Sequence, residues 1–552
     1  MISCLERKMI DVKFGEKKKR IESMSLLELA KDEGQEDVVA AIVNNETRNM
    51  EFILTEDSEI QWITDKDSDG YKILLRTATL IFLLAGKRIL PDENMVVEHS
   101  IGNGLYVERK NGKPIKRDFL EKIEKEMKNI ISENLEINRK KVDREIAISL
   151  FEKEGYEDKI RLLETLENDQ YDLYIVGGHY FSFHGYLAPF TGFIKKFKLQ
   201  SYYPGAVILI PTPESKGRVP SFKEEKSLAK IFESSKKWTE LLDIGCVGSL
   251  NEKIQNNKMD FLIDVAEAYF ENQVLEIAED IVRDGSISMV QIAGPSSSGK
   301  TTLAYKLSVQ LGVHGLRPIP LSMDDYFVHR KDTPLDEEGN MDFEAVEAID
   351  LDLFNKDLLA LVEGEEIELP KFNFVTGIRE MSGQKIKLEK NSILIIEGIH
   401  GLNPKLTRLI PEKKKYKVYV SALTQLNMDA HNRISTTDIR LLRRLVRDHR
   451  TRGKSVDDVF WEWKNVQRGE RKHIYPYQDL ADYAMDSSLI YEIPVLKKYA
   501  KKLFATYPRD GQYYKEVKKL DSFLKYFLEI QNEDTIPRKS ILREFIGQKE
   551  EG

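Results

Sequence analysis

Short apolar runs alternate with amphipathic segments through the second half of the chain. The runs lie at 286–294, 317–325, 391–398 and 416–423, and they are typical of strands buried on both faces of a sheet. Longer segments with helical apolar spacing separate them. Alternation of this kind predicts a parallel sheet with helices on both faces, so we expect an α/β domain in this half.

The first half of the chain predicts two smaller α+β units. Residues 9–14 and 51–56 predict strands, and the apolar spacing over 25–43 predicts a helix. Three further helices are expected, the second and third of them amphipathic: 71–89, 117–135 and 143–155. The pattern changes at 211–221, where Pro, Ser and Gly indicate a linker, and a helical stretch follows over 261–282.

These changes of pattern divide the chain into five parts. We expect a small α+β unit, a larger α+β domain, a linker with a helical connector, an α/β domain and a helical extension. Their ranges are 1–65, 66–212, 213–285, 286–500 and 501–552.

The composition narrows the class of protein. Of the 552 residues, 41% are hydrophobic and 32% are charged, which is typical of a soluble globular chain. A formal charge of −8 argues against nonspecific nucleic-acid binding, although a local basic patch stays open. The apolar runs are shorter than the roughly 20 residues that span a bilayer. We therefore expect a cytoplasmic protein with no membrane contact, and a homo-oligomer stays open.

The segment 291–304, QIAGPSSSGKTTLA, contains a phosphate-binding motif. Gly294, Gly299, Lys300 and Thr301 fit every fixed position of G-x-x-x-x-G-K-[ST], between a predicted strand and a helix. Backbone N–H groups of such a loop point at phosphate oxygens, the lysine neutralises them, and the threonine hydroxyl binds Mg²⁺. We predict that ATP and Mg²⁺ are the cofactors. The predicted binding residues are Gly294, Pro295, Ser296, Ser297, Ser298, Gly299, Lys300, Thr301 and Thr302.

Two carboxylates follow predicted strands of the same sheet. Asp324 lies where the strand over 317–325 ends, and a carboxylate there can orient an attacking hydroxyl and accept its proton. Glu397 ends the strand of 391–398 and can hold Mg²⁺ through water. The alternative is that both are ordinary solvated carboxylates at the ends of strands.

Arginines recur at helical spacing further along the chain. Arg440, Arg443, Arg444 and Arg447 lie on one predicted helix. An arginine-lined face can stabilise the charge of a transferring phosphoryl group. Without other evidence, a solvated basic face is the simpler interpretation.

Together, these motifs resemble the uridine/cytidine kinase and phosphoribulokinase family over about 286–500. The resemblance is carried, in the family's order, by GPSSSGKT, LSMDDYF, MDFEAVEAID, FNFVTGIR, LIIEG and RRLVRDHRTRGK. It implies a P-loop NTPase fold and an ATP-dependent kinase of a small molecule.

The resemblance also implies roles for individual residues. Asp324 falls on the catalytic base, and Arg444, Arg447 and Lys454 fall on a mobile lid over the phosphates. The implied acceptor-binding residues are Asp324, Tyr326, Glu344, Phe372, Phe374 and Arg379. The sequence departs from the family at Gly377, where uridine/cytidine kinases have a histidine that reads the pyrimidine edge.

The N-terminal half resembles a different family. Residues 9–62 resemble the small ubiquitin-like TGS module, and 70–205 resemble the second additional domain of threonyl-tRNA synthetases, through YKILLRTATLIFLLAGKRILP, DFLEKIEKEMKNII and GGHYFSFHGYLAPFTGFIKKFKL. In those synthetases, three histidines and a cysteine remove mischarged amino acids. By position they fall here on Arg76, Leu80, Ile175 and His179, so we expect the editing reaction to be lost.

The sequence therefore predicts a kinase with two accessory modules. We expect it to phosphorylate the 5′-hydroxyl of a nucleoside, with uridine or cytidine first. One alternative is a kinase of a sugar or another small alcohol. Another is an RNA-binding regulator with an ATP switch, whose N-terminal modules bind tRNA-like structure.

Overall fold

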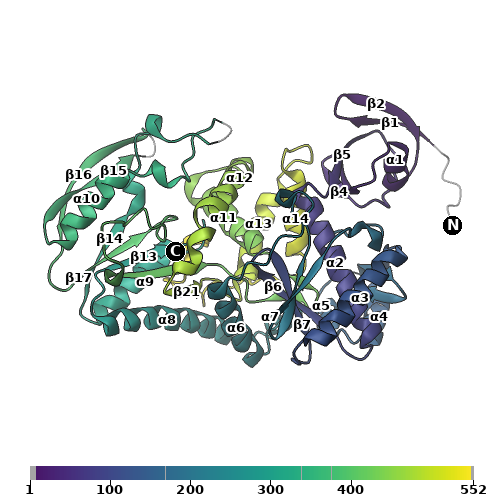
Figure 1. The fold of residues 1–552 in the computed structure, drawn as a ribbon, viewed down its shortest axis with the longest axis horizontal. Coiled ribbons are helices and arrows are strands. Elements are labelled where there is room, and N and C mark those ends of the chain that lie inside the picture. The colour runs from purple at the N-terminus through teal and green to yellow at the C-terminus, as the bar shows by residue number, and fades with distance from the viewer. Residues whose placement is uncertain (1–7, 168, 337–338, 374–375, 549–552) are drawn as a thin grey trace.

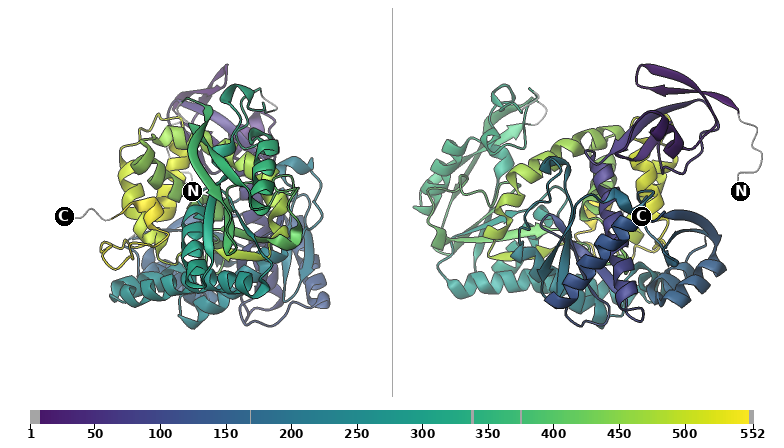
Figure 2. Two further views of the ribbon diagram at one scale, coloured as in Figure 1. Left: turned by 90° about the vertical axis from the view of Figure 1, so that its left-hand side faces the viewer. Right: turned by 45° about the vertical axis from the view of Figure 1, so that its right-hand side comes forward.

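The computed structural model describes residues 8–548 apart from 168, 337–338 and 374–375. The parallel-sheet domain lies on the left of Figure 1, the second α+β domain lies at the lower right, and the first unit projects above it. The right-hand view of Figure 2 shows the same division, with the first unit set apart from the parallel sheet.

The first unit is a mixed sheet with the ubiquitin-like arrangement. Its strand order is β2-β1-β5-β3-β4, with β1 and β5 parallel and the other neighbours antiparallel. The helix α1 (Leu26–Asp32) begins in a capping box formed by Ser25 and Glu28. The strands are β1 Met9–Phe14, β2 Lys17–Glu22, β3 Val38–Val43, β4 Glu46–Arg48 and β5 Ser58–Thr64.

Two local predictions in this unit are wrong. The helix expected over 25–43 ends at Asp32, and its second part is the strand β3. Nearly every residue of β3 is buried, so the alternation that marks a half-buried strand is missing. The strand expected over 51–56 is irregular, with a single bridge between Ser25 and Ile53.

The second domain is built around α2 (Ser68–Ile89), in which every residue from 77 to 87 is buried. A four-stranded antiparallel sheet has the order β11-β12-β7-β6, and a three-stranded one has the order β10-β9-β8. The strands are β6 Met95–Ile101, β7 Gly104–Arg109, β8 Asn138–Asp143, β9 Gln170–Val176, β10 His179–Phe181, β11 Lys198–Tyr202 and β12 Gly205–Leu209. The remaining helices are α3 Arg117–Glu133, α4 Arg144–Glu154 and α5 Glu157–Glu164.

Three helices connect this domain to the parallel sheet. They are α6 Lys226–Leu241, α7 Val247–Gln255 and α8 Met259–Asp284. The predicted linker precedes them and is irregular apart from a short 3-10 turn at Pro213–Ser215.

The C-terminal half has the expected parallel sheet. Its strand order is β14-β17-β13-β18-β21, and every neighbouring pair is parallel. Along β17, Ile393 and Ile395 pack in the core that contains α8 and α9, whereas Leu394 and Ile396 pack in the core that contains α10. Helices therefore cover both faces, as predicted. The bounds are β13 Met289–Ala293, α9 Lys300–Val313, β14 Arg317–Ser322, α10 Leu351–Val362, β17 Ser392–Glu397, β18 Lys415–Ser421 and β21 Tyr483–Asp486.

Further elements surround this sheet. Two hairpins, β15–β16 and β19–β20, lie outside it. The bounds are β15 Glu366–Asn373, β16 Ile378–Lys387, β19 Asn427–Asp429, β20 Asn432–Arg433, α11 Thr436–Arg452, α12 Val456–His473, α13 Glu492–Ala505, α14 Tyr514–Leu524 and α15 Arg543–Ile546. Within the part of the chain that the structure describes, no helix is both long and apolar enough to cross a membrane.

The hairpin β19–β20 joins the two larger domains. Asp429 accepts a hydrogen bond from Lys159 of the second domain at 2.7 Å, and both side chains are almost fully buried. Asn432 donates to the carbonyl of Ser182, and the N–H of His184 donates to the Asn432 side chain. Because α11 begins shortly after the hairpin, the second domain is attached close to the start of that helix.

Candidate active site

The phosphate loop, residues 294–301, connects β13 to α9 at the carboxyl edge of the sheet. Gly299 has a φ of +82°, in the left-handed region that favours glycine. The ammonium group of Lys300 donates only to the carbonyls of Gly294 and Pro295, at 3.1 and 3.2 Å, with no carboxylate partner among the described residues. The buried hydroxyl of Ser298 has no hydrogen-bond partner there either. A cation and a free donor at a helix N-terminus fit a phosphate ligand.

The two predicted metal-binding residues lie together. Thr301 Oγ1 donates a hydrogen bond to Glu397 Oε1 at 3.2 Å. Burial raises the pKa of Glu397, the Lys300 ammonium opposes that rise, and Asp324 adds to it. A hydroxyl beside a carboxylate at this edge provides the oxygen ligands that Mg²⁺ prefers.

Asp324 lies in a 3-10 turn, Met323–Tyr326, directly after β14. Its side chain reaches solvent, but the surrounding protein displaces enough water to raise the carboxyl pKa. The nearby charges of Lys300 and Arg452 oppose this rise. Asp324 therefore lies within electrostatic reach of the phosphate loop and stays accessible to a small molecule.

Glu344 reaches the same site from the chain before α10. Its side chain packs against Gly469 of α12. The pKa of Glu344 is raised to about 7: burial is the largest cause and the neighbouring Glu470 adds to it, whereas Arg444 and Lys300 oppose the rise. Glu344 can therefore exchange a proton near neutral pH, beside the phosphate loop.

The structure does not bring the predicted acceptor-binding residues together as one surface. Tyr326 is fully buried, and its hydroxyl donates to Asp357 at 3.0 Å, so its ring is a core residue. Phe372 is also buried and packs against Phe327, with ring centroids 5.6 Å apart. Phe374 lies outside the described residues.

Arg379 is held by protein groups. It donates to Asp350 Oδ2 at 2.8 Å and to the carbonyls of Tyr326 and Phe327 at 3.4 Å. These hydrogen bonds hold the Arg379 guanidinium against the backbone at the end of the turn that contains Asp324.

Gly377 has a structural reason to be glycine. Its φ is +71°, and an added Cβ would lie 2.7 Å from Arg330 Cβ and 2.9 Å from Arg330 Nε. The Arg330 N–H also donates to the Gly377 carbonyl at 2.8 Å. Arg330 thus occupies the space into which a larger side chain at 377 would extend.

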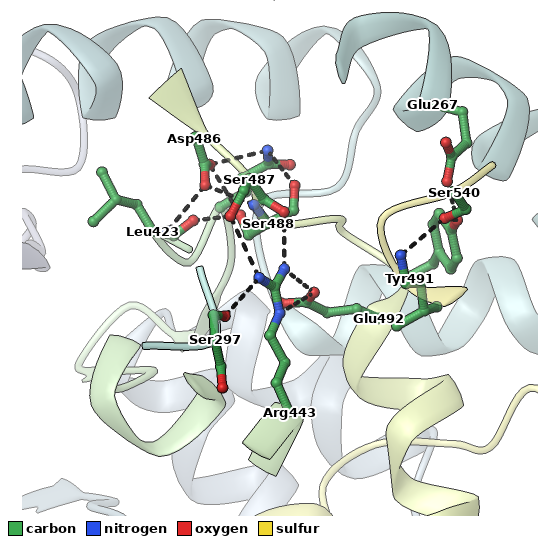
Figure 3. Close-up of polar contacts among 12 residues, drawn as sticks. Glu267, Ser297, Leu423, Arg443, Asp486, Ser487, Ser488, Tyr491, Glu492 and Ser540 are labelled. Atoms are coloured by element: carbon green, nitrogen blue, oxygen red, sulfur yellow. Dashed lines mark hydrogen bonds and ion pairs between the residues drawn. The ribbon is translucent and has the colours of Figure 1, made fainter. Parts of the chain in front are cut away.

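Two of the four α11 arginines singled out from the sequence are structural. Arg440 and Arg443 are almost fully buried and donate to the loop carbonyls of Ser296 and Ser297 at 3.1 and 3.3 Å. Glu470 and Glu492 neutralise them. Figure 3 shows Arg443 between Ser297, Ser487 and Glu492. The expectation of one solvated or phosphate-facing arginine surface is therefore wrong for these two, because helical spacing does not show which face is buried.

The other two arginines lie at the edge of the site. Arg444 donates to the Ser296 hydroxyl at 2.8 Å and to Glu462 at 2.6 Å. Arg447 donates to Asp448 at 2.7 Å. Lys454 is bound to Glu462 as well, at 2.6 Å. These cations are positioned by carboxylates beside the loop.

No motif in the sequence marks the carboxylates that hold these cations. Glu470 accepts a hydrogen bond from the Ser296 N–H at 3.0 Å and also binds Arg440. Glu462 holds Arg444 and Lys454. They belong to α12, whereas the arginines belong to α11, so no spacing within one helix relates the partners.

In the second domain, the four positions aligned with the editing residues of the synthetases have different surroundings. Leu80 is fully buried, and the Arg76 Nε donates to the Tyr186 carbonyl at 3.0 Å. His179 Nδ1 lies 3.2 Å from Glu154 Oε1. Among the described residues, no group of His, Cys, Asp and Glu has the arrangement of a metal site.

Comparison with known proteins also divides the chain, because its two halves match different proteins. Residues 289–489 match the model of the Phosphoribulokinase / Uridine kinase family, so the C-terminal region contains a domain of that family. Threonine–tRNA ligase of Thermotoga petrophila is 35% identical over 191 residues, which cover 34% of this chain and 29% of the ligase. Threonine–tRNA ligase 2 of Bacillus subtilis is 36% identical over 166 residues, or 30% and 26% of the two chains. This chain therefore spans less than a third of the curated relatives it matches.

Solved structures show only distant similarity. A possible uridine kinase from Bacillus stearothermophilus is 20% identical, with a TM-score of 0.23, over 36% of this chain and 89% of the other. A putative fructose transport system kinase from Silicibacter is 18% identical, with a TM-score of 0.28, over 38% and 98%.

Proposed function

We propose that this chain is an ATP-dependent phosphotransferase whose acceptor is the 5′-hydroxyl of a nucleoside, with uridine or cytidine first. The observation that carries the proposal is the convergence of Lys300, Asp324 and Glu397 at one edge of the parallel sheet. A cation for phosphates, an accessible carboxylate and a metal-binding pair are the parts that phosphoryl transfer to an alcohol needs. The family match over 289–489 supports a small-molecule kinase.

Each group has a distinct role. When bound, ATP with Mg²⁺ supplies the phosphoryl group and part of its charge neutralisation. Lys300 and the loop N–H groups hold the phosphates, and Thr301 with Glu397 holds the metal. Asp324 orients the acceptor hydroxyl and takes its proton. Arg444 and Arg447 stabilise the transferring group and exclude water once they exchange their carboxylate partners.

A sugar or another small alcohol is the second candidate acceptor. The close contact of Arg330 with Gly377 favours it, because a guanidinium takes the place of a base-reading side chain at that turn. The burial of Phe372 and Tyr326 also reduces the aromatic surface on which a base could stack.

An RNA-binding regulator with an ATP switch is the third candidate. The similarity of the N-terminal half to threonine–tRNA ligases supports it. Such a protein would bind RNA with a strong dependence on salt concentration.

The experiment is phosphoryl transfer from ATP with Mg²⁺ to a panel of nucleosides and sugars. Wild type, Lys300→Ala and Asp324→Asn are compared, with Asp172→Asn on the second domain as a matched control. We expect transfer to uridine or cytidine by wild type and the control, and none above background by the other two variants. Transfer to a sugar alone selects the second candidate. ATP binding without transfer to any acceptor contradicts the kinase proposal.

A further inference from the structure

The chain beyond the family domain returns to the phosphate loop. The helix α15 packs on α11. An added Cβ at Gly299 would collide with Ile541 Cδ1. The apolar side chains of this segment are at most 1% exposed: Ile541, Leu542, Phe545 and Ile546. Residues 540–547 are thus part of the packed structure around the loop.

Two buried contacts hold the segment beside the loop. Ser540 Oγ lies 3.4 Å from the Tyr491 hydroxyl, which also donates to Glu267 (Figure 3). The Phe545 ring lies 4.8 Å from the guanidinium carbon of Arg443. Because Arg443 also binds the Ser297 carbonyl, the backbone of this segment is fixed relative to the loop.

One side chain of the segment points at the anion-binding end of α9. The Thr302 hydroxyl donates to Glu544 Oε2 at 2.6 Å, and Arg447 Nη1 lies 3.9 Å from Glu544 Oε1. Thr302 is in the first turn of α9, where backbone N–H groups have no partner within the helix. That turn, after a glycine-rich loop, is the place where phosphate oxygens bind. The carboxylate therefore lies where a nucleotide phosphate would approach.

We propose that Glu544 is an internal anionic competitor for the nucleotide: its carboxylate accepts the hydrogen bond of the Thr302 hydroxyl and pairs with Arg447 until a phosphate replaces it. This inference rests on the proposed function in one respect, that the loop binds a nucleotide. Two anions cannot share these donors without repulsion. The backbone around Glu544 is anchored, whereas its side chain is 22% exposed, so that side chain alone can turn outward.

Two consequences follow. Nucleotide affinity is lower than the loop alone would give, because binding must displace the carboxylate. Displacement also removes the ion pair between Glu544 and Arg447 Nη1, so that this end of the guanidinium can face the phosphates while Asp448 holds Nε. The competition concerns phosphate only, and a nucleoside without phosphate is not subject to it.

The test is binding of MgATP, MgADP and adenosine to full-length wild type and Glu544→Gln by titration calorimetry. The amide keeps the shape and a hydrogen bond to Thr302 but removes the charge. We expect Kd for both nucleotides to fall about tenfold, a gain of ~1.4 kcal/mol, with no change for adenosine. Glu529→Gln is the matched control, since Glu529 pairs with Lys501 away from the loop, and it should bind as wild type does.

The direction of the change decides the outcome. Weaker nucleotide binding by Glu544→Gln would mean that Glu544 helps to hold the nucleotide, and unchanged binding would mean that it is a bystander. Either result overturns the competitor role while leaving the proposed function intact. Binding by neither wild type nor Glu544→Gln overturns the proposed function and the competitor role together.

Discussion

The carboxyl edge of the parallel sheet and the α2–β10 surface of the second domain contain very different sets of side chains. At the sheet edge, Lys300, Asp324 and Glu397 come from separate segments, and the Lys300 ammonium opposes the rise in the pKa of both carboxyl groups. On the second domain, His179 is one of the four positions aligned with the editing residues of the synthetases. Two of the others are the buried Leu80 and Ile175, and Glu154 holds the His179 imidazole.

Several polar groups converge at the sheet edge, whereas His179 is the one histidine among the four aligned positions of the second domain. Several convergent groups are needed for chemistry, and one imidazole beside apolar residues does not supply them. The second domain has another visible task in this chain, because it buries the hairpin β19–β20 next to the start of α11. It therefore acts as a support for the kinase-like domain in this structure.

The strongest test of the contrast is Asp324→Asn. We expect kcat to fall by about 10²–10⁴, because the hydroxyl loses its proton acceptor, while nucleotide affinity is kept. Steady-state kinetics and a separate binding titration measure the two quantities. A variant with unchanged kcat would remove Asp324 from the site.

Removing the buried ion pair between the domains should have the next largest effect. Asp429→Ala leaves the Lys159 ammonium buried without its partner, so we expect a loss of about 3–5 kcal/mol in unfolding free energy. Urea denaturation measures it. Asp172→Ala is the matched control: its ion pair with Arg139 is partly exposed, and a loss of about 0–1 kcal/mol is expected. Equal losses in both variants would contradict the supporting role.

Adding a side chain at Gly377 should lower the unfolding free energy of the kinase-like domain. For Gly377→His we expect a cost of about 1–3 kcal/mol, because the residue must adopt a positive φ and displace Arg330. Gly383→Ala separates the two causes, since Gly383 has a φ of +74° but open space around it. If Gly377→His unfolds no more easily than Gly383→Ala, Arg330 is not an obstacle.

The raised pKa of Glu344 predicts that KM for the acceptor depends on pH. A deprotonated carboxylate accepts hydrogen bonds from an acceptor's hydroxyls, so KM for the acceptor should fall as pH rises through about 7. Glu344→Gln should show a flat profile of KM against pH.

The same residue predicts a pH dependence of stability. Because the folded pKa of Glu344 is raised, the stability that it contributes at low pH is lost as pH rises toward 7. Thermal unfolding of wild type and Glu344→Gln across this pH range checks the sign of the change in stability.

The smallest effect is expected on the second domain. His179→Ala removes one partly exposed hydrogen bond to Glu154, so we expect a loss of about 1 kcal/mol and unchanged phosphoryl transfer. Unfolding and activity are measured on the same preparation. A large fall in kcat would show that this histidine acts on the distant site.

Local sequence was sufficient wherever short-range rules decide the structure. The phosphate loop depends on Gly299 and Lys300 at fixed spacing, and its position between a strand and a helix follows from the neighbouring apolar runs. The parallel sheet, α2 and α8 were likewise predicted from periodicity. The strand β3 was not, because burial on both faces removes the alternation by which a strand is recognised.

Tertiary structure alone decided which charged side chains are structural. Arg440 and Arg443 have the same local pattern as Arg444, but Glu470 and Glu492 bind them in the interior, whereas Arg444 keeps 8% exposure beside the loop. Tyr326 beside Asp324 turns into the core, and Glu544 reaches the phosphate loop from 242 residues away along the chain. These outcomes depend on which distant segments meet, and the burial and charge they create, so no local pattern in the sequence contains them.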